Sequence, residues 1–233
     1  MPELFTFIGA MFGVSHHADP EAYKMVIYIT HMLLSAGIAL MLVKMAMGNL
    51  KMVPTGTQNV MEAYISGVLK MGTDVMGKEQ ARRFLPLVAT IGLFVGIANL
   101  IGVIPGFEAP TAFLEFAFTL AVSVFIYYNY IGIKEQGVIK YFKHFLGPVW
   151  WLYWLMFPIE IVSHFSRLVS LSFRLFGNVK GDDMFLMVIL MLAPWVLPMI
   201  PFALLTFMAF LQAFIFMMLT YVYLGGAVAV DDH

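Results

Sequence analysis

The sequence predicts an all-α integral membrane protein with five transmembrane helices and one amphipathic surface helix, in which the last two helices are long and strongly tilted. Hydrophobic residues make up 61% of the 233 residues, charged residues only 12%, and the mean hydropathy is +0.88. Soluble domains are far less apolar than this. Several apolar stretches also reach about 20 residues, the length that crosses about 30 Å of hydrocarbon. We therefore expect residues 1–233 to form a single membrane domain.

Three stretches have the length of simple spans. Residues 25–43, 84–104 and 113–133 are each long enough to cross the hydrocarbon core as a helix. Residues 53–76 differ, because polar side chains recur at regular intervals between apolar ones. This pattern is typical of an amphipathic helix that lies on the membrane surface.

The last two elements are longer than one perpendicular crossing requires. Residues 148–178 and 183–225 run to about 30 and about 40 residues, so these helices must tilt, bend or lie partly flat. Asp183 follows Gly181 at the expected turn, where its carboxylate would begin the last helix and could act as a cap. Candidate kinks are provided by Pro158, Pro194, Pro198 and Pro201.

The distribution of lysine and arginine predicts the orientation. Two connections are rich in basic residues, and the positive-inside rule places both in the cytoplasm. The N-terminus is then outside and the C-terminus cytoplasmic, and we expect the membrane to be a bacterial inner membrane. The basic residues are Lys44, Lys51, Lys70, Lys78, Arg82 and Arg83 in the first connection and Lys134, Lys140 and Lys143 in the second. An aromatic belt is predicted at Trp150, Trp151, Tyr153 and Trp154.

Several classes of function have no support in the sequence. It contains no cysteine, which excludes disulfides and thiolate metal sites, and no phosphate-binding glycine loop, HExxH or nucleophile elbow. The net charge of −1 argues against nucleic acid as a partner. The adjacent His16 and His17 are more simply interpreted as solvated side chains than as metal ligands. No cofactor and no metal ion are expected.

A polar stripe follows one face of an otherwise apolar helix around Arg174. At about 100° per residue, its members fall within roughly 40° of one line. A guanidinium remains charged in the membrane and costs at least a few kcal/mol there, so such a stripe normally faces protein or water and marks an ion path. Arg167 could instead snorkel to the headgroups, and the serines could serve packing alone. The stripe consists of Glu160, Ser163, Arg167, Ser170, Arg174 and Asn178.

Acidic and titratable residues lie on both sides of Arg174. Glu160 is roughly 21 Å away along the helix axis, at 1.5 Å per residue, and Asp183 follows on the other side. His164, about 80° from Arg174 around the helix, is either a helix-contact residue or a titratable group in an aqueous passage. Carboxylates on both sides of a fixed cation suit two offset water-filled passages that an electrostatic barrier separates.

The residues of this stripe carry a family resemblance. The run Ser170-Leu-Ser-Phe-Arg174-Leu-Phe-Gly-Asn178 resembles subunit a of the F-type ATP synthases. The same is true of Leu211-Gln212-Ala-Phe-Ile-Phe216 and Tyr221-Val-Tyr-Leu224. Supporting matches are Asn99-Leu-Ile-Gly-Val-Ile-Pro105, Pro110-Thr111-Ala112 and Glu160. The resemblance extends from about Val53 to the C-terminus and leaves the first helix generic.

The resemblance implies a stator subunit in the membrane sector of a rotary motor. Its partners would be a ring of c subunits that each carry one carboxylate, the b subunits of the peripheral stalk, the F1 sector and membrane lipid. Arg174 would be the essential arginine that faces the ring carboxylates. The resemblance favours protons over sodium as the coupling ion. Protons would pass Asp183, Asn178 and Gln212 and would leave near Glu160. Gln212 would face Arg174. The subunit itself would not catalyse chemistry on ATP.

The chain departs from the family pattern at three places near the predicted path. Asp183 stands where many relatives carry glutamate or histidine, and Leu205 stands where a titratable residue is common. Phe113 and Glu115 replace asparagines that are common after the Pro-Thr-Ala turn, which makes Glu115 a further candidate for the inlet. The inlet would then use other groups, or water alone, in place of the residue missing at Leu205.

Two other classes of function remain open from the sequence. A self-contained transporter or channel could use the Arg174 stripe to bind an anion between helices. Such proteins often contain inverted repeats, and no repeat is visible here. In the second alternative, the protein is a scaffold subunit in which the stripe only fixes helix packing. A stator should purify with its ring and a peripheral ATPase, whereas a transporter should function alone.

Overall fold

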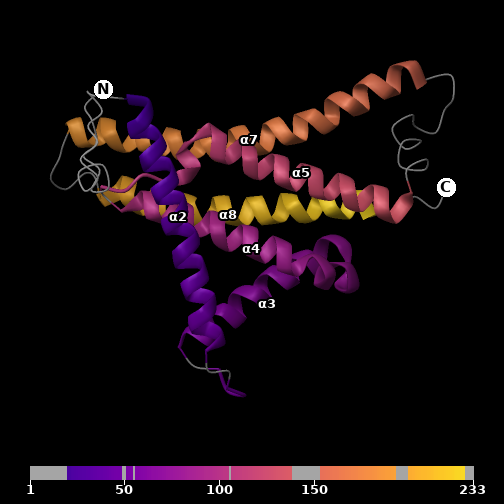
Figure 1. The fold of residues 1–233 in the computed structure, drawn as a ribbon, viewed down its shortest axis with the longest axis horizontal. Helices are drawn as coiled ribbons and strands as arrows, with labels where there is room; N and C mark the ends of the chain where they lie inside the picture. Colours follow the sequence, from indigo (N-terminus) through magenta and orange to yellow (C-terminus); the bar gives the residue numbers. More distant parts are fainter. Residues whose placement is uncertain are drawn as a thin grey trace.

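The structure is a computed structural model that describes residues 20–48, 51–54, 56–104, 106–137, 153–192 and 199–228. All regular structure in these residues is helical, which confirms the predicted all-α class. Figure 1 shows α5, α7 and α8 running in similar directions while α2 crosses them. The elements are α2 (Pro20–Met47), α3 (Thr57–Met76), α4 (Lys78–Val103), the short 3-10 helix η1 (Pro110–Ala112), α5 (Leu114–Gln136), α7 (Tyr153–Leu192) and α8 (Met199–Val228).

Four of the described helices are long and apolar enough to cross a membrane. They correspond to α2 from Tyr23 onward, α4, α5 and α8. The longest helix, α7, is not one of them, because the ionisable and hydroxyl side chains of the stripe lower its hydropathy. A fifth crossing by α7, and its tilt, therefore remain predictions.

The boundary between the last two helices differs from the expected one. Helix α7 continues without interruption through Asn178 and Gly181 to Leu192, and α8 begins only at Met199. Asp183 is thus an interior residue of α7, and the expectation that it begins and caps the last helix is wrong. Apolar residues resume directly after Asp183, so the helical pattern carries on past a single glycine that costs only about 1 kcal/mol.

Helix α3 packs against α4 and against the second half of α8. Its apolar stripe is covered by protein there, and Val68 is buried. The contact with α8 is close, because a Cβ atom at Gly72 would lie 2.6 Å from the ring of Tyr221. Only glycine fits at this crossing. The opposite, polar face of α3 stays exposed, as an amphipathic helix requires.

The packed centre that positions the polar stripe lies where α4, α5, α7 and α8 meet. Leu171 and Leu175 of α7 are buried there against Ala117 and Ala121 of α5 and Phe216 of α8. The two alanines let the α7 backbone approach α5 closely, as small residues do between membrane helices. One side of α7 is therefore fixed against protein, directly beside the stripe.

Some sequence predictions concern residues outside those described. These are the His16 and His17 pair, Lys140, Lys143, Pro105, Pro194, Pro198, Trp150, Trp151, the side chain of Tyr153 and residues 148–152 at the start of the predicted fourth span.

Candidate functional site

The polar stripe of α7 lies at the edge of its buried face. Leu168, Leu171 and Leu175 are buried, whereas Phe173, next to Arg174, is 57% exposed. The stripe runs along the border between these two surfaces, where a side chain can reach both the helix bundle and whatever covers its exposed face. Its half-buried members are Glu160, Ser163, Arg167, Arg174 and Asn178, and Ser170 is exposed.

Asn178 connects the stripe to α8. Its Nδ2 donates a hydrogen bond to Oε1 of Gln212 over 2.9 Å. Gln212 is buried at 3% exposure, so its amide group depends on such a partner. The resemblance implied that Gln212 faces Arg174, but the hydrogen-bond partner of Gln212 is Asn178, one helical turn further along α7.

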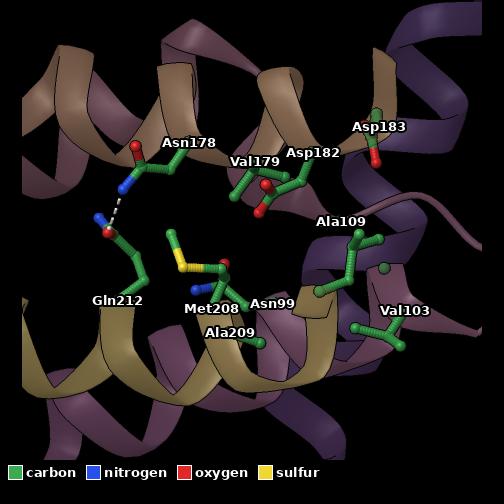
Figure 2. A pocket seen from close by; sticks show the side chains of 12 residues that line it. Asn99, Val103, Ala109, Asn178, Val179, Asp182, Asp183, Met208, Ala209 and Gln212 are labelled. Atoms are coloured by element: carbon green, nitrogen blue, oxygen red, sulfur yellow. Dashed lines mark hydrogen bonds between the residues drawn. The ribbon is translucent and has the colours of Figure 1, made fainter. Parts of the chain in front are cut away.

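An open cavity with about 30 Å³ of space for water lies beside this amide pair, between α4, α7 and α8. We call it the α4–α7–α8 cavity. Figure 2 shows the Asn178–Gln212 bond at one end, with Asp182 directed between the helices and Asp183 nearer to Ala109. The lining residues are Asn99, Gly102, Val103, Ala109, Asn178, Val179, Asp182, Asp183, Leu205, Met208, Ala209 and Gln212.

Two carboxylates enter this cavity from successive positions of α7. Asp182 and Asp183 are both half-buried and both line it. The charged groups that act on Asp183 are Lys180, Glu108 and Asp182. Sequence reasoning selected Asp183 and did not select Asp182, although its position beside Asp183 was a signal. Leu205 lies in the same wall, so Asp182 adds a titratable group to the cavity where Leu205 lacks one.

The α4 side of the cavity contributes a buried amide. Oδ1 of Asn99 accepts a hydrogen bond from the Thr111 hydroxyl over 2.5 Å. Its Nδ2 is buried and has no hydrogen-bond partner among the described residues. An unpaired buried donor is costly, and this cavity has about 30 Å³ of space for water, enough for about one molecule that could accept from it. In the sequence, Asn99 stands out only as part of a motif that matches the family.

A second polar group forms further toward the start of α7. Nδ1 of His164 lies 3.0 Å from the Tyr128 hydroxyl of α5, and Nε2 lies 3.6 Å from Oε1 of Glu160. We call Glu160, His164 and Tyr128 the His164 cluster. His164 is buried at 8% exposure, so it is a helix-contact residue, and it is also bonded to a polar neighbour. The structure thus supports the helix-contact alternative, and a role for His164 in an aqueous passage stays a prediction.

Arg167 borders a smaller cavity next to the His164 cluster. This cavity is too narrow for a water molecule and is lined by Tyr128, Arg167 and Tyr223 together with apolar residues of α5 and α7. The guanidinium carbon of Arg167 lies 5.8 Å from the centre of the Tyr223 ring, within cation–π range. This contact places Arg167 against protein and gives it a partner other than headgroups.

Arg174 lies between the two polar regions. Its guanidinium has no hydrogen bond or ion pair with any described residue. A half-buried charged group needs a counter-charge or water, since an uncompensated charge in a low-dielectric surrounding is strongly unfavourable. The arrangement thus provides a fixed cation on a partly exposed face, with protonatable groups and cavities on both sides.

Glu115 is not brought to this site. Its side chain is exposed at the start of α5, and it does not line either of the cavities described. The structure therefore gives no contact that supports the inlet role considered for it.

The chain was compared with known proteins. The sequence model described as "ATP synthase A chain" matches residues 26–225. An ATP synthase subunit a from Sulfurimonas denitrificans is 85% identical over the full length of both chains. The Helicobacter hepaticus protein of the same name is 60% identical over 87% of this chain and 89% of its own length. The Campylobacter jejuni protein is 59% identical over 100% of this chain and 99% of its own. The chain therefore belongs to the ATP synthase A chain family.

Proposed function

We propose that this chain is the proton-conducting stator subunit in the Fo sector of a rotary F-type ATP synthase, in a bacterial inner membrane. It couples proton translocation to ATP synthesis through two offset half-channels that Arg174 separates. The observation that carries this proposal is the single stripe on α7, in which Arg174 has no polar partner among the described residues and lies between the α4–α7–α8 cavity and the His164 cluster. Family membership supports the same function.

The partner of the exposed face is a ring of c subunits. On α7, Val169 and Phe173 are exposed, and on α8 Phe207, Phe210 and Phe214 follow at helical spacing. These apolar faces flank Arg174 and suit a surface of small membrane helices that slides past in lipid. The b subunits of the peripheral stalk would hold the chain against this ring and connect it to the F1 sector.

Proton entry uses the α4–α7–α8 cavity. A proton from outside reaches Asp183 and Asp182, passes along the cavity to the Asn178–Gln212 pair, and neutralises a ring carboxylate. The amide groups transfer no net charge themselves and instead orient water beside the carboxylates. A neutral carboxyl can then rotate into lipid without the cost of an unpaired charge.

Proton exit uses the His164 cluster. After nearly a full turn the ring carboxyl reaches the region of Arg167 and Glu160, where the positive charge of Arg167 favours its ionisation. The released proton passes to Glu160 or His164, which lie 3.6 Å apart, and leaves to the cytoplasm. Each proton that moves across about 100 mV supplies about 2.3 kcal/mol toward rotation.

Arg174 attracts the arriving carboxylate and prevents protons from crossing directly between the half-channels. Ser170, one turn away on the exposed side, lies where it can contact the same carboxylate. Lysine would be a poor replacement for Arg174, because an ammonium group can lose its proton in an apolar setting whereas a guanidinium does not.

The test is ATP-driven acidification of inverted membrane vesicles that contain the complete complex with Arg174→Ala. We expect pumping to fall below detection while the complex still contains its ring and F1 sector, and passive leak to stay equal or rise. Arg82→Ala, which removes an exposed arginine of α4, is the matched control and should pump normally. Pumping near the native rate in Arg174→Ala would refute the proposal.

A further inference from the structure

Helix α2 is attached to the bundle through one narrow stripe. Ile27, His31 and Ser35 are spaced one turn apart, and none is more than 1% exposed. Apart from Ala46, the other described side chains of α2 are exposed or half-buried, and the sequence pattern of the helix resembles a simple membrane span. Two of the three buried residues are polar, which a helix with only an anchoring role does not require. The hydrogen-bond partners of His31 show which segment of the chain this stripe contacts.

His31 bridges α2 and the segment before η1. Its Nδ1 lies 2.8 Å from the Ile27 carbonyl oxygen, and its Nε2 lies 3.2 Å from the backbone nitrogen of Glu108. A carbonyl can only accept and a backbone N–H can only donate. The ring is therefore neutral, with its proton on Nδ1, and Nε2 accepts from Glu108. Both ring nitrogens are engaged, so His31 itself carries no proton along a path.

The same segment is fixed to α2 by aromatic contacts on both sides of this bond. The Phe107 ring meets the His31 ring edge-to-face at 5.8 Å, and Tyr28 meets Phe113 in the same way at 5.4 Å. The contact with Tyr28 gives Phe113 a packing role beside the Pro-Thr-Ala turn.

On its other side the segment is pressed against α4. A Cβ atom at Gly102 would lie 2.5 Å from Cβ of Ala109, so only glycine permits this approach. Thr111 donates its hydrogen bond to Asn99 in the same contact. The segment is thus clamped between α2 and α4, and a change at either side should move it.

This clamped segment forms part of the α4–α7–α8 cavity. Ala109 lines the cavity, as Figure 2 shows, and the neighbouring Glu108 is half-buried. Glu108 is also one of the charged groups that act on Asp183 of α7. A displacement of the Glu108 backbone would therefore change both the cavity wall and the distribution of negative charge opposite α7.

We propose that His31 is a positioning residue of the proton path, which sets the cavity wall and the Glu108 carboxylate through its hydrogen bond to the Glu108 backbone. Helix α2 then anchors the chain in the membrane and also positions the wall of the entry channel. The role in translocation rests on the proposed function, whereas the contact itself does not.

Two substitutions separate this bond from simple packing. In His31→Gln the side-chain amide reaches about as far as Nε2 and can accept from Glu108. In His31→Asn it reaches only about as far as Nδ1 and can keep the local bond to Ile27. Both variants bury a neutral amide in place of a neutral ring, and His31→Leu, which is close to Gln in bulk but cannot accept a hydrogen bond, is the packing control that should behave like His31→Asn.

The readout is a thiol in the cavity wall of the complete complex. The chain has no cysteine, so Met208→Cys provides one labelling site within it. We expect its reaction rate with a water-soluble maleimide, without ATP, to change roughly 3-fold or more in His31→Asn and to stay within about 2-fold in His31→Gln, as loss of one neutral hydrogen bond would produce. ATP-driven acidification without the thiol should fall in the same order.

Equal labelling in the two variants, or a labelling difference without a pumping difference, would overturn the proposal. If neither variant assembles, nitrogen NMR of histidine-labelled native complex decides the matter. The proposal requires an unprotonated Nε2 in contact with the Glu108 amide, and a proton on that nitrogen would refute it. Should Arg174→Ala pump while labelling still distinguishes the His31 variants, the proposed function fails and the contact stands.

Discussion

The α4–α7–α8 cavity and the His164 cluster lie on the same helix and derive from the same polar stripe, yet they differ in construction. Near Asn178 the facing residues include Ala209 and Gly102, which leave about 30 Å³ of space for water. Near His164 the facing residues are Tyr128 and Tyr223, which fill the space and leave no room for a water molecule. The first region is suited to water, and the second to direct contact between side chains. The size of the residues opposite α7 therefore decides the character of each half of the path.

The two carboxylates of the α4–α7–α8 cavity give the strongest test of this difference. We expect Asp182→Asn together with Asp183→Asn to lower ATP-driven acidification by about 100-fold, because general acid–base groups contribute about 10²–10⁴. Each single change should have a much smaller effect, since the other carboxylate remains in the same cavity. Vesicle acidification rates at equal amounts of assembled complex provide the measurement.

Glu115→Gln is the control for these variants, because it also neutralises one carboxylate but at an exposed position outside the cavity. Its rate should stay within about 2-fold of the native one, as is usual for surface changes of up to about 0.5 kcal/mol. A large loss in Glu115→Gln, or none in the double aspartate variant, would show that the entry path runs elsewhere.

The amide pair at the end of the cavity should behave as one unit. Asn178→Leu and Gln212→Leu each remove the 2.9 Å hydrogen bond and leave one partner unpaired, so each should slow pumping by about 5-fold to 10-fold. The double variant should be no worse than the poorer single one, because two apolar groups leave no orphaned amide. Acidification rates of the native protein, the two single variants and the double variant give the coupling between the two substitutions directly. Independent, multiplying losses would mean that the two amides act separately.

The smallest effect is expected in the His164 cluster. Tyr128→Phe removes the 3.0 Å contact with His164 but keeps the ring that fills the space. We expect a loss of about 1 kcal/mol in stability and only about a 2-fold slower acidification, because Glu160 and His164 remain within 3.6 Å of each other. Thermal denaturation of the purified complex measures the loss of stability, and vesicle acidification measures the pumping rate.

The matched control for this substitution is Tyr130→Phe, an exposed position on α5 where the same hydroxyl is removed without consequence. If Tyr128→Phe abolished pumping, the exit region would depend on its hydroxyl in the way that the entry region depends on its carboxylates, and the contrast between the two regions would disappear.

The sequence by itself determined the membrane class, the helical spacing that aligns Glu160, Arg174 and Asn178, and the family motif. All of these are local: composition, a period of 3.6 residues, and runs of neighbouring residues. The sequence did not locate the end of α7 correctly. A glycine beside two aspartates is a pattern typical of a turn, but α7 continues through these residues.

Only the tertiary structure decided which side chains face one another. Gln212 pairs with Asn178, Asp182 joins Asp183 in one cavity, and His31 reaches the backbone of Glu108 across 77 positions of the sequence. Such pairings depend on the packing of helices that are distant along the chain, where a single small residue such as Gly102 or Ala209 opens space and a single tyrosine closes it. Helical periodicity fixes which face of one helix is polar, but not what that face meets.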